Sequence, residues 1–143
     1  MYYHRLLLEL SLLIGAFQDN LATNVLICIA AISNAVMDIL KDKFQKSVFQ
    51  NYNENFWNPS KSYLNKYIDR DDSKGRKYPS WLSGIMDSFS DVWHIAKLIM
   101  IICIIIGFCL TKTFSWQNLI YCWLIWGSTF WIFYNKIFIK KIK

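Results

Sequence analysis

Residues 92–113 read VWHIAKLIMIICIIIGFCLTKT and are the most informative segment about the fold. A helix needs about 20 predominantly apolar residues to cross the hydrocarbon core of a bilayer, and this stretch has that length. Lys97 lies near one end, where its ammonium group can extend to the headgroup region. From Ile99 to Thr111 no residue is charged. The stretch therefore predicts a transmembrane helix.

Two further stretches meet the same requirement. Residues 21–40 carry one charge, Asp38, and residues 119–138 carry one, Lys136. The N-terminal stretch is ambiguous, because its apolar part, residues 6–17, makes only about 18 Å of helix. We expect residues 2–18 to cross as well. An interfacial helix and a cleaved signal peptide are the alternatives, although residues 16–18 (Ala-Phe-Gln) lack the small-residue pattern of a cleavage site.

The composition agrees with a membrane protein. Of 143 residues, 55% are hydrophobic and 18% are charged, whereas a soluble domain carries about 25% charged residues. The aromatic content of 17% excludes a disordered chain, and the four cysteines form no disulfide framework. We predict an all-α, polytopic transmembrane bundle that forms one domain over residues 1–143. It has four helices, or three with an interfacial N-terminal helix.

The distribution of charge predicts the orientation. The chain has 16 Lys and Arg against 10 Asp and Glu, a net charge of +6. Most basic residues fall between positions 41 and 97 or in the C-terminal tail, next to apolar spans, as the positive-inside rule requires. Residues 41–91 and the tail are therefore predicted to be cytoplasmic. The expected partners are the lipid bilayer, further copies of the chain or other membrane proteins, and not nucleic acid.

The connection at residues 41–91 is predicted to consist of amphipathic helices. An apolar residue recurs every four positions at its start, which indicates that the helix of residues 21–40 continues into the cytoplasm or bends along the membrane surface. The four are Phe44, Val48, Tyr52 and Phe56. Asn58 and Pro59 form a cap and first turn of a short helix over residues 60–68. Ser80 is a candidate N-cap of a helix that runs into the stretch at 92–113.

Small residues in the spans indicate close helix packing. Gly127 and Ser128 lie between tryptophans of the last span, and Ala31 and Ala35 lie in the second. Small side chains allow helices to approach closely. We favour packing over a cofactor pocket for these positions, and we expect the cysteines to be free and buried.

One set of polar residues is a candidate site. Asp87, Asp91, His94 and Lys97 have spacings that place them on one face of a helix, and Asn34, Asp38 and Asp42 do so on the second span. Both faces are expected at similar depth. The possible metal ligands, for a divalent ion, are Asp38, Asp87, Asp91 and His94. The possible catalytic residues, for acid–base chemistry on a lipid headgroup, are Asp38, Asp91 and His94.

The competing interpretation is structural. Polar groups at this depth need partners whatever their role, so Asp38 and Asp91 are more simply expected to pair with Lys97, Arg5 or a nearby asparagine. No HxxxH, HExxH or CxxC spacing, glycine-rich phosphate loop or serine elbow is present. Glu9 is a second intramembrane charge, for which a structural role is favoured over ion or proton conduction.

Four blocks of sequence carry a resemblance. They are NAVMD (34–38), FWNPS (56–60), NKY (65–67) and DVWHIAK (91–97). Together they resemble small, uncharacterised polytopic membrane proteins of bacteria and their phages, over residues 30–100. The resemblance implies no activity, but it implies that the four blocks belong to one unit.

The function predicted from the sequence is that of a non-enzymatic component of a membrane assembly. The alternative is a small membrane enzyme that acts on a lipid or another interfacial substrate. An ion- or proton-conducting oligomer is a third possibility.

Overall fold

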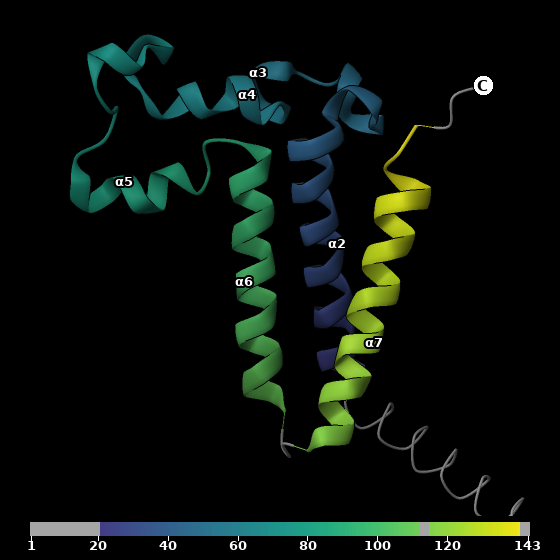
Figure 1. Ribbon diagram of the computed structural model, residues 1–143. Coiled ribbons are helices and arrows are strands. Elements are labelled where there is room, and N and C mark those ends of the chain that lie inside the picture. The colour runs from purple at the N-terminus through teal and green to yellow at the C-terminus, as the bar shows by residue number, and fades with distance from the viewer. Residues whose placement is uncertain (1–20, 112–114, 141–143) are drawn as a thin grey trace, which may run out of the picture.

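Three long helices run side by side in the computed structural model, which describes residues 21–111 and 115–140 (Figure 1). They are α2 (Leu21–Lys43), α6 (Val92–Leu110) and α7 (Trp116–Ile132), and a π-helical segment (Phe133–Ile137) extends α7. Helix α2 packs against both α6 and α7. The short elements between α2 and α6 gather at one end of this bundle (Figure 1). They are 3₁₀ turns at Phe44–Lys46 and Val48–Asn51, α3 (Glu54–Trp57), α4 (Pro59–Ser62), 3₁₀ turns at Tyr63–Lys66, Ile68–Arg70 and Asp72–Lys74, and α5 (Ser80–Asp87).

The described part of the chain is helical and contains no strand, which confirms the predicted all-α class. Two of its helical segments are long and apolar enough to cross a membrane. One is α2 together with the 3₁₀ turn that follows it (Leu21–Lys46), and the other is α6 (Val92–Leu110). The third predicted span, residues 119–138, is helical as far as Ile137 through α7 and its π-helical extension. The expected first span, residues 2–18, lies outside the described residues.

Small side chains line the contact between the long helices. Ala30, Ala31 and Ala35 of α2 have no exposed surface. A Cβ atom at Gly107 of α6 would lie 3.9 Å from side-chain atoms of Leu26 and Thr23, which is ordinary van der Waals contact. The prediction of close packing at positions 31 and 35 is therefore confirmed.

A cluster of apolar side chains closes one end of the bundle. Ile39, Leu40, Phe44 and Phe49 are buried. The ring of Phe49 stacks on Trp57, with centroids 4.9 Å apart, and contacts Phe138 at 5.1 Å. This cluster joins the end of α2, the connecting segment and the end of α7, so the connection is attached to the bundle through aromatic contacts.

The predicted continuation of α2 through residue 56 is wrong, because α2 ends at Lys43 and the chain becomes extended at Ser47 (φ −96°, ψ 163°). The backbone there bonds to the C-terminal segment, with Val48 N donating to Phe138 O at 2.9 Å and Lys140 N to Lys46 O at 2.9 Å. The fourfold apolar spacing reflects the aromatic cluster and not a continuous helix.

Ser47 stabilises this turn, and its replacement is the first testable change. Its side chain is fully buried and donates to Phe44 O at 2.7 Å while accepting from Phe49 N at 3.2 Å. We expect Ser47→Ala to lower the free energy of unfolding by about 1 kcal/mol, through loss of both bonds. Thermal unfolding in detergent measures this. Ser60→Ala is the control, because no hydrogen bond of the Ser60 hydroxyl occurs in the described part of the chain, and an equal effect of both changes would contradict the assignment.

Two predicted helix starts have different outcomes. Asn58 caps α4 as expected, with its Oδ1 accepting from Ser60 N at 3.1 Å and Pro59 in the first turn. Ser80 is not an N-cap, because α5 begins at that residue and Pro79 precedes it in the cap position. Helix α5 does not run into α6 either. It ends at Asp87, and α6 begins at Val92 after a turn that ends at Asp91.

Candidate functional site

The candidate site is built around Asp91, the N-cap of α6. Its carboxylate accepts from His94 N at 2.9 Å and contacts His94 Nδ1 at 2.9 Å through each oxygen. Ser90 Oγ adds a bond of 3.2 Å to Oδ2. Only 2% of the residue is exposed. A carboxylate at this position satisfies a free N–H of the first turn and complements the helix dipole.

His94 links Asp91 to the connecting segment. Its Nε2 lies 3.0 Å from Lys66 Nζ, and its side chain is 26% exposed. An ammonium group only donates, so Nε2 accepts and the ring proton is on Nδ1, where it is donated to Asp91. The three residues form one hydrogen-bonded chain, Lys66–His94–Asp91, which holds the first turn of α6 against the 3₁₀ turn at Tyr63–Lys66.

Asn65 fastens the same two segments. Its Nδ2 donates to Asn55 O at 2.8 Å and to Ser90 O at 2.9 Å. Neither Asn65 nor Lys66 was predicted as a site residue, because helical spacing relates only near neighbours and these contacts join residues far apart in the sequence. The one signal for them was their place in the block at residues 65–67.

Asp87 is not part of this chain of bonds. The turn at residues 88–91 removes it from the helix that carries His94. Its Oδ2 instead accepts from Arg76 at 2.7 Å, and its side chain is 15% exposed. The predicted single stripe from Asp87 to Lys97 is therefore interrupted, since Ser88 and Ser90 bond backward to the carbonyls of Gly84 and Asp87 and end α5.

Asp38 lies on α2 as predicted, half-buried. Its carboxylate forms no hydrogen bond or ion pair with Asp91 or His94. Among residues 21–111 and 115–140, no three His, Cys, Asp or Glu side chains gather where they would hold a metal ion. A metal role for Asp38, Asp87, Asp91 and His94 stays a prediction, as does joint catalysis by Asp38, Asp91 and His94.

Lys97 and Glu9 are the remaining polar groups that the sequence singled out. Lys97 does not pair with Asp91; its Nζ lies 5.3 Å from the centre of the Trp93 ring, a cation–π distance. Glu9, with Arg5 and His4, lies outside the described residues. The four cysteines are free, as expected, although Cys109 is exposed and only Cys103 is buried.

The hydrogen-bonded chain has two chemical properties. The imidazole is fixed in one tautomer, because a carboxylate lies on one side and an ammonium group on the other. Both of its nitrogens are occupied, so it has no free lone pair for a substrate in this arrangement. The geometry therefore favours a structural role, in which the three residues connect α6 to the segment that precedes it.

Comparison of the chain with family models, with curated proteins and with solved structures finds no match. The class defined by the fold is that of an all-helical protein with two helices suited to cross a membrane.

Proposed function

We propose that this chain is a small integral membrane protein that assembles with other helices in the bilayer and catalyses no reaction. The observation that carries the proposal is the exposure of α6. Only 22% of the apolar stretch of α6 is buried inside the molecule, whereas 50% of the apolar stretch of α2 is buried. A core helix of a soluble protein would have its apolar side chains buried. A helix with this surface is stable where the solvent is lipid.

The exposed side chains cover the faces of α6 that do not pack against α2. They are Ile99, Ile101, Ile102, Ile104, Ile105, Ile106, Phe108 and Leu110, each at least 40% exposed. Monomeric soluble proteins rarely expose contiguous apolar patches of more than a few hundred Å². Exposure of these faces of α6 to water is therefore unfavourable, whereas exposure to hydrocarbon is not.

The charges support one orientation. Every charged residue of the described part belongs to the second half of α2, to the first turns of α6, to the connection between them, or to the segment from Lys136 onward. These regions lie at the same end of the bundle (Figure 1). No described residue at the opposite end, near Leu21, Leu110 and Trp116, is charged. The positive-inside rule assigns the charged end to the cytoplasm.

The proposed topology has four crossings. An apolar cavity of about 470 Å³ lies between α2, α6 and α7 near Thr23 and Gly107. This is the end of α2 that follows directly on the apolar stretch of residues 6–17. We propose that residues 2–18 cross as well, which gives four crossings and puts the N-terminus on the cytoplasmic side.

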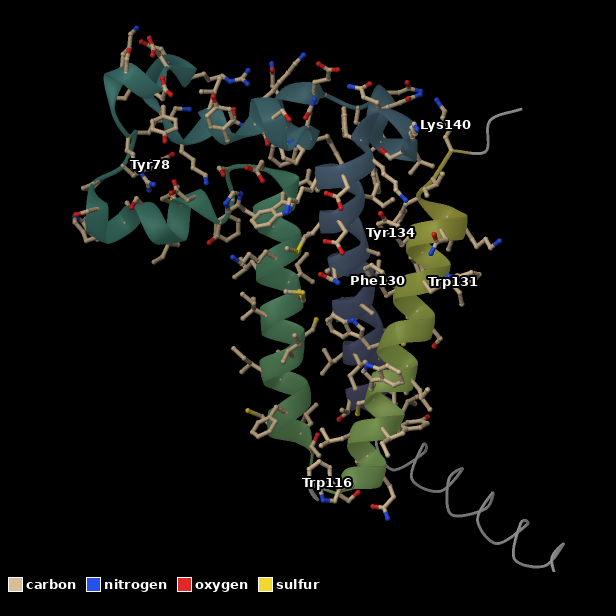
Figure 2. The ribbon with its side chains drawn as sticks, viewed as in Figure 1. Tyr78, Trp116, Phe130, Trp131, Tyr134 and Lys140 are labelled. Carbon is tan, nitrogen blue, oxygen red and sulfur yellow. The ribbon has the colours of Figure 1, made fainter. Side chains whose placement is uncertain are left out.

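Helix α7 supplies the proposed assembly face. Exposed residues recur along it at spacings of three and four, which places them on one side of the helix. They include Ile120, Trp123, Leu124, Gly127, Ser128 and Trp131. Trp131 points away from α2, whereas Tyr134 lies on the side of α2 (Figure 2). A Cβ atom added to Gly127 would meet no atom within 4 Å. Two small residues between tryptophans leave room for the backbone of a partner helix.

Replacement of Gly127 tests the assembly. We expect the wild-type protein to be oligomeric in mild detergent, and Gly127→Leu to shift it toward the monomer, because the larger side chain prevents close approach of a second helix. Native mass in detergent and cross-linking in membranes measure this. Gly84→Leu is the matched control, since it also has open space around it but lies on α5. A monomeric wild-type protein that does not cross-link would contradict the proposal.

A second candidate function is that of an enzyme on an interfacial substrate. The observation in its favour is the buried carboxylate of Asp91 bonded to the imidazole of His94, which is a common arrangement in acid–base catalysis. Incubation of the purified protein with a bacterial lipid extract, followed by mass spectrometry, tests it. A product that appears with the wild type and is lost with His94→Gln would establish this function over the first, and its absence, with and without Mg²⁺, would reject it.

A further inference from the structure

A polar pocket lies where α2 ends. Its volume is about 470 Å³, and the last turn of α2, the 3₁₀ turn that follows and the start of α4 line it. The polar residues are Lys41, Asp42, Lys43, Gln45, Lys46, Asn58 and Ser60. With three ammonium groups and one carboxylate, the pocket has an excess of positive charge. It is separate from the Lys66–His94–Asp91 chain and from the assembly face of α7.

None of the three lysines forms an ion pair within residues 21–111 and 115–140. Lys41 interacts electrostatically with the carboxylate of Asp38, three residues earlier on α2. Lys43 instead lies over the Tyr134 ring, with Nζ 4.5 Å from its centre. Other basic residues nearby are partnered, since Lys61 pairs with Glu54 and Arg76 with Asp87. Unpaired ammonium groups that share one pocket repel one another unless an anion binds between them.

The neighbouring polar groups suit a phosphate. Asn58 uses its Oδ1 in capping α4, so its Nδ2 group has two protons to donate. Ser60 is exposed and adds a hydroxyl group. A phosphate has several acceptor oxygens, which ammonium, amide and hydroxyl donors can satisfy together.

The position of the pocket indicates that the phosphate belongs to a lipid headgroup. Residues 21–40 of α2 make about 30 Å of helix, which equals the thickness of the hydrocarbon core. The pocket begins at Leu40 and Lys41, so it lies at the level of the lipid phosphates when α2 crosses the bilayer. Basic pockets at the cytoplasmic ends of transmembrane helices bind anionic headgroups.

We propose that this pocket binds the phosphate group of an anionic phospholipid, through Lys41, Lys43 and Lys46. The proposal rests on the proposed function, since α2 must cross the bilayer for the headgroups to reach the pocket. Bound lipid would offset part of the positive charge of the lysines and hold the end of α2 and the start of α4 at the membrane surface.

Isothermal titration calorimetry on the purified full chain in neutral detergent tests the proposal. The probes are dihexanoyl phosphatidylglycerol, phosphatidylcholine of the same chain length, and inorganic phosphate. We expect phosphatidylglycerol to bind at least tenfold more tightly than either of the others. Equal binding of the two lipids would overturn the proposal, and inorganic phosphate that binds as tightly as phosphatidylglycerol would overturn the assignment to a lipid.

Charge variants locate the site. Each lysine near an anionic surface contributes about a fivefold change in affinity, so Lys43→Gln combined with Lys46→Gln is expected to weaken phosphatidylglycerol binding about 25-fold. Lys74→Gln with Lys77→Gln removes the same charge from the loop between α4 and α5 and is expected to change binding less than twofold. Equal losses in both double variants would overturn the assignment to the pocket.

Asp42→Asn gives an effect of the opposite sign. It removes the one carboxylate of the pocket and is expected to tighten binding about fivefold, a gain that loss of folding cannot produce. Unchanged or weaker binding in this variant would overturn the proposal. Retention of the protein in membranes and its native mass are measured in parallel, so a failure of lipid binding is distinguished from a failure of the proposed function.

Discussion

Ile102→Arg is expected to prevent stable insertion of the protein into membranes. Ile102 lies near the middle of α6 and is 44% exposed. At the centre of a transmembrane helix an arginine costs about 3 kcal/mol, which shifts the insertion equilibrium by more than a hundredfold. In water the same change at an exposed position would alter stability by no more than about 0.5 kcal/mol. The amount of protein in the membrane fraction, compared with the wild type, measures the effect.

Ile68→Arg is the matched control for this change. Ile68 is 43% exposed, almost the same as Ile102, but it lies in the charged connecting segment. We expect the Ile68 variant to accumulate in membranes like the wild type. If Ile102→Arg accumulates normally as well, α6 is not in contact with lipid and the proposed environment of the protein is wrong.

Asp91→Ala is expected to destabilise the folded protein by about 3 kcal/mol. The change removes the N-cap bond to His94 N, which contributes about 1 kcal/mol. It also removes the bonds of a buried carboxylate to His94 Nδ1 and Ser90 Oγ, which contribute about 2 kcal/mol more. Lys66 would then hold an imidazole that has lost its other partner. For a chain of this size we expect a fall of about 10 °C in the unfolding temperature.

Near-UV circular dichroism of the protein in detergent follows this unfolding. Asp71→Ala is the control, because Asp71 also caps a helical turn, by accepting from Ser73 N at 3.0 Å and Ser73 Oγ at 2.7 Å, but is less buried than Asp91. We expect a much smaller fall for that variant. A fall for Asp91→Ala no larger than for Asp71→Ala would show that the hydrogen bonds around His94 contribute little to the fold.

The long helices were predictable because a span depends on its own residues. The charge-free run that follows Ile99 is sufficient to predict α6, and the run between Asp19 and Asp38 predicts α2. The end of α2 was not predictable in this way. It depends on the backbone bonds between Val48 and Phe138 and between Lys46 and Lys140, which join segments that are far apart in the sequence.

The candidate site was predictable only where its contacts lie within one helix. The spacing of Asp91 and His94 places them together within one turn, and the structure confirms that they are bonded. The spacing also predicted that Asp87 shares a helix face with Asp91 and His94. This is wrong, because the serines of the turn at residues 88–91 end α5 and separate Asp87 from α6. Lys66 contacts His94 from another segment, and helical periodicity carries no information about such a contact.

Extraction of membranes at alkaline pH tests whether the protein is integral to the bilayer. Sodium carbonate at pH 11 releases peripheral and soluble proteins and leaves integral ones in the membrane. The full chain is expressed without a fusion partner, and the pellet and the supernatant are compared after centrifugation. We expect the wild-type protein to remain in the pellet and to be released only by detergent. Recovery of the protein in the supernatant without detergent would contradict this expectation.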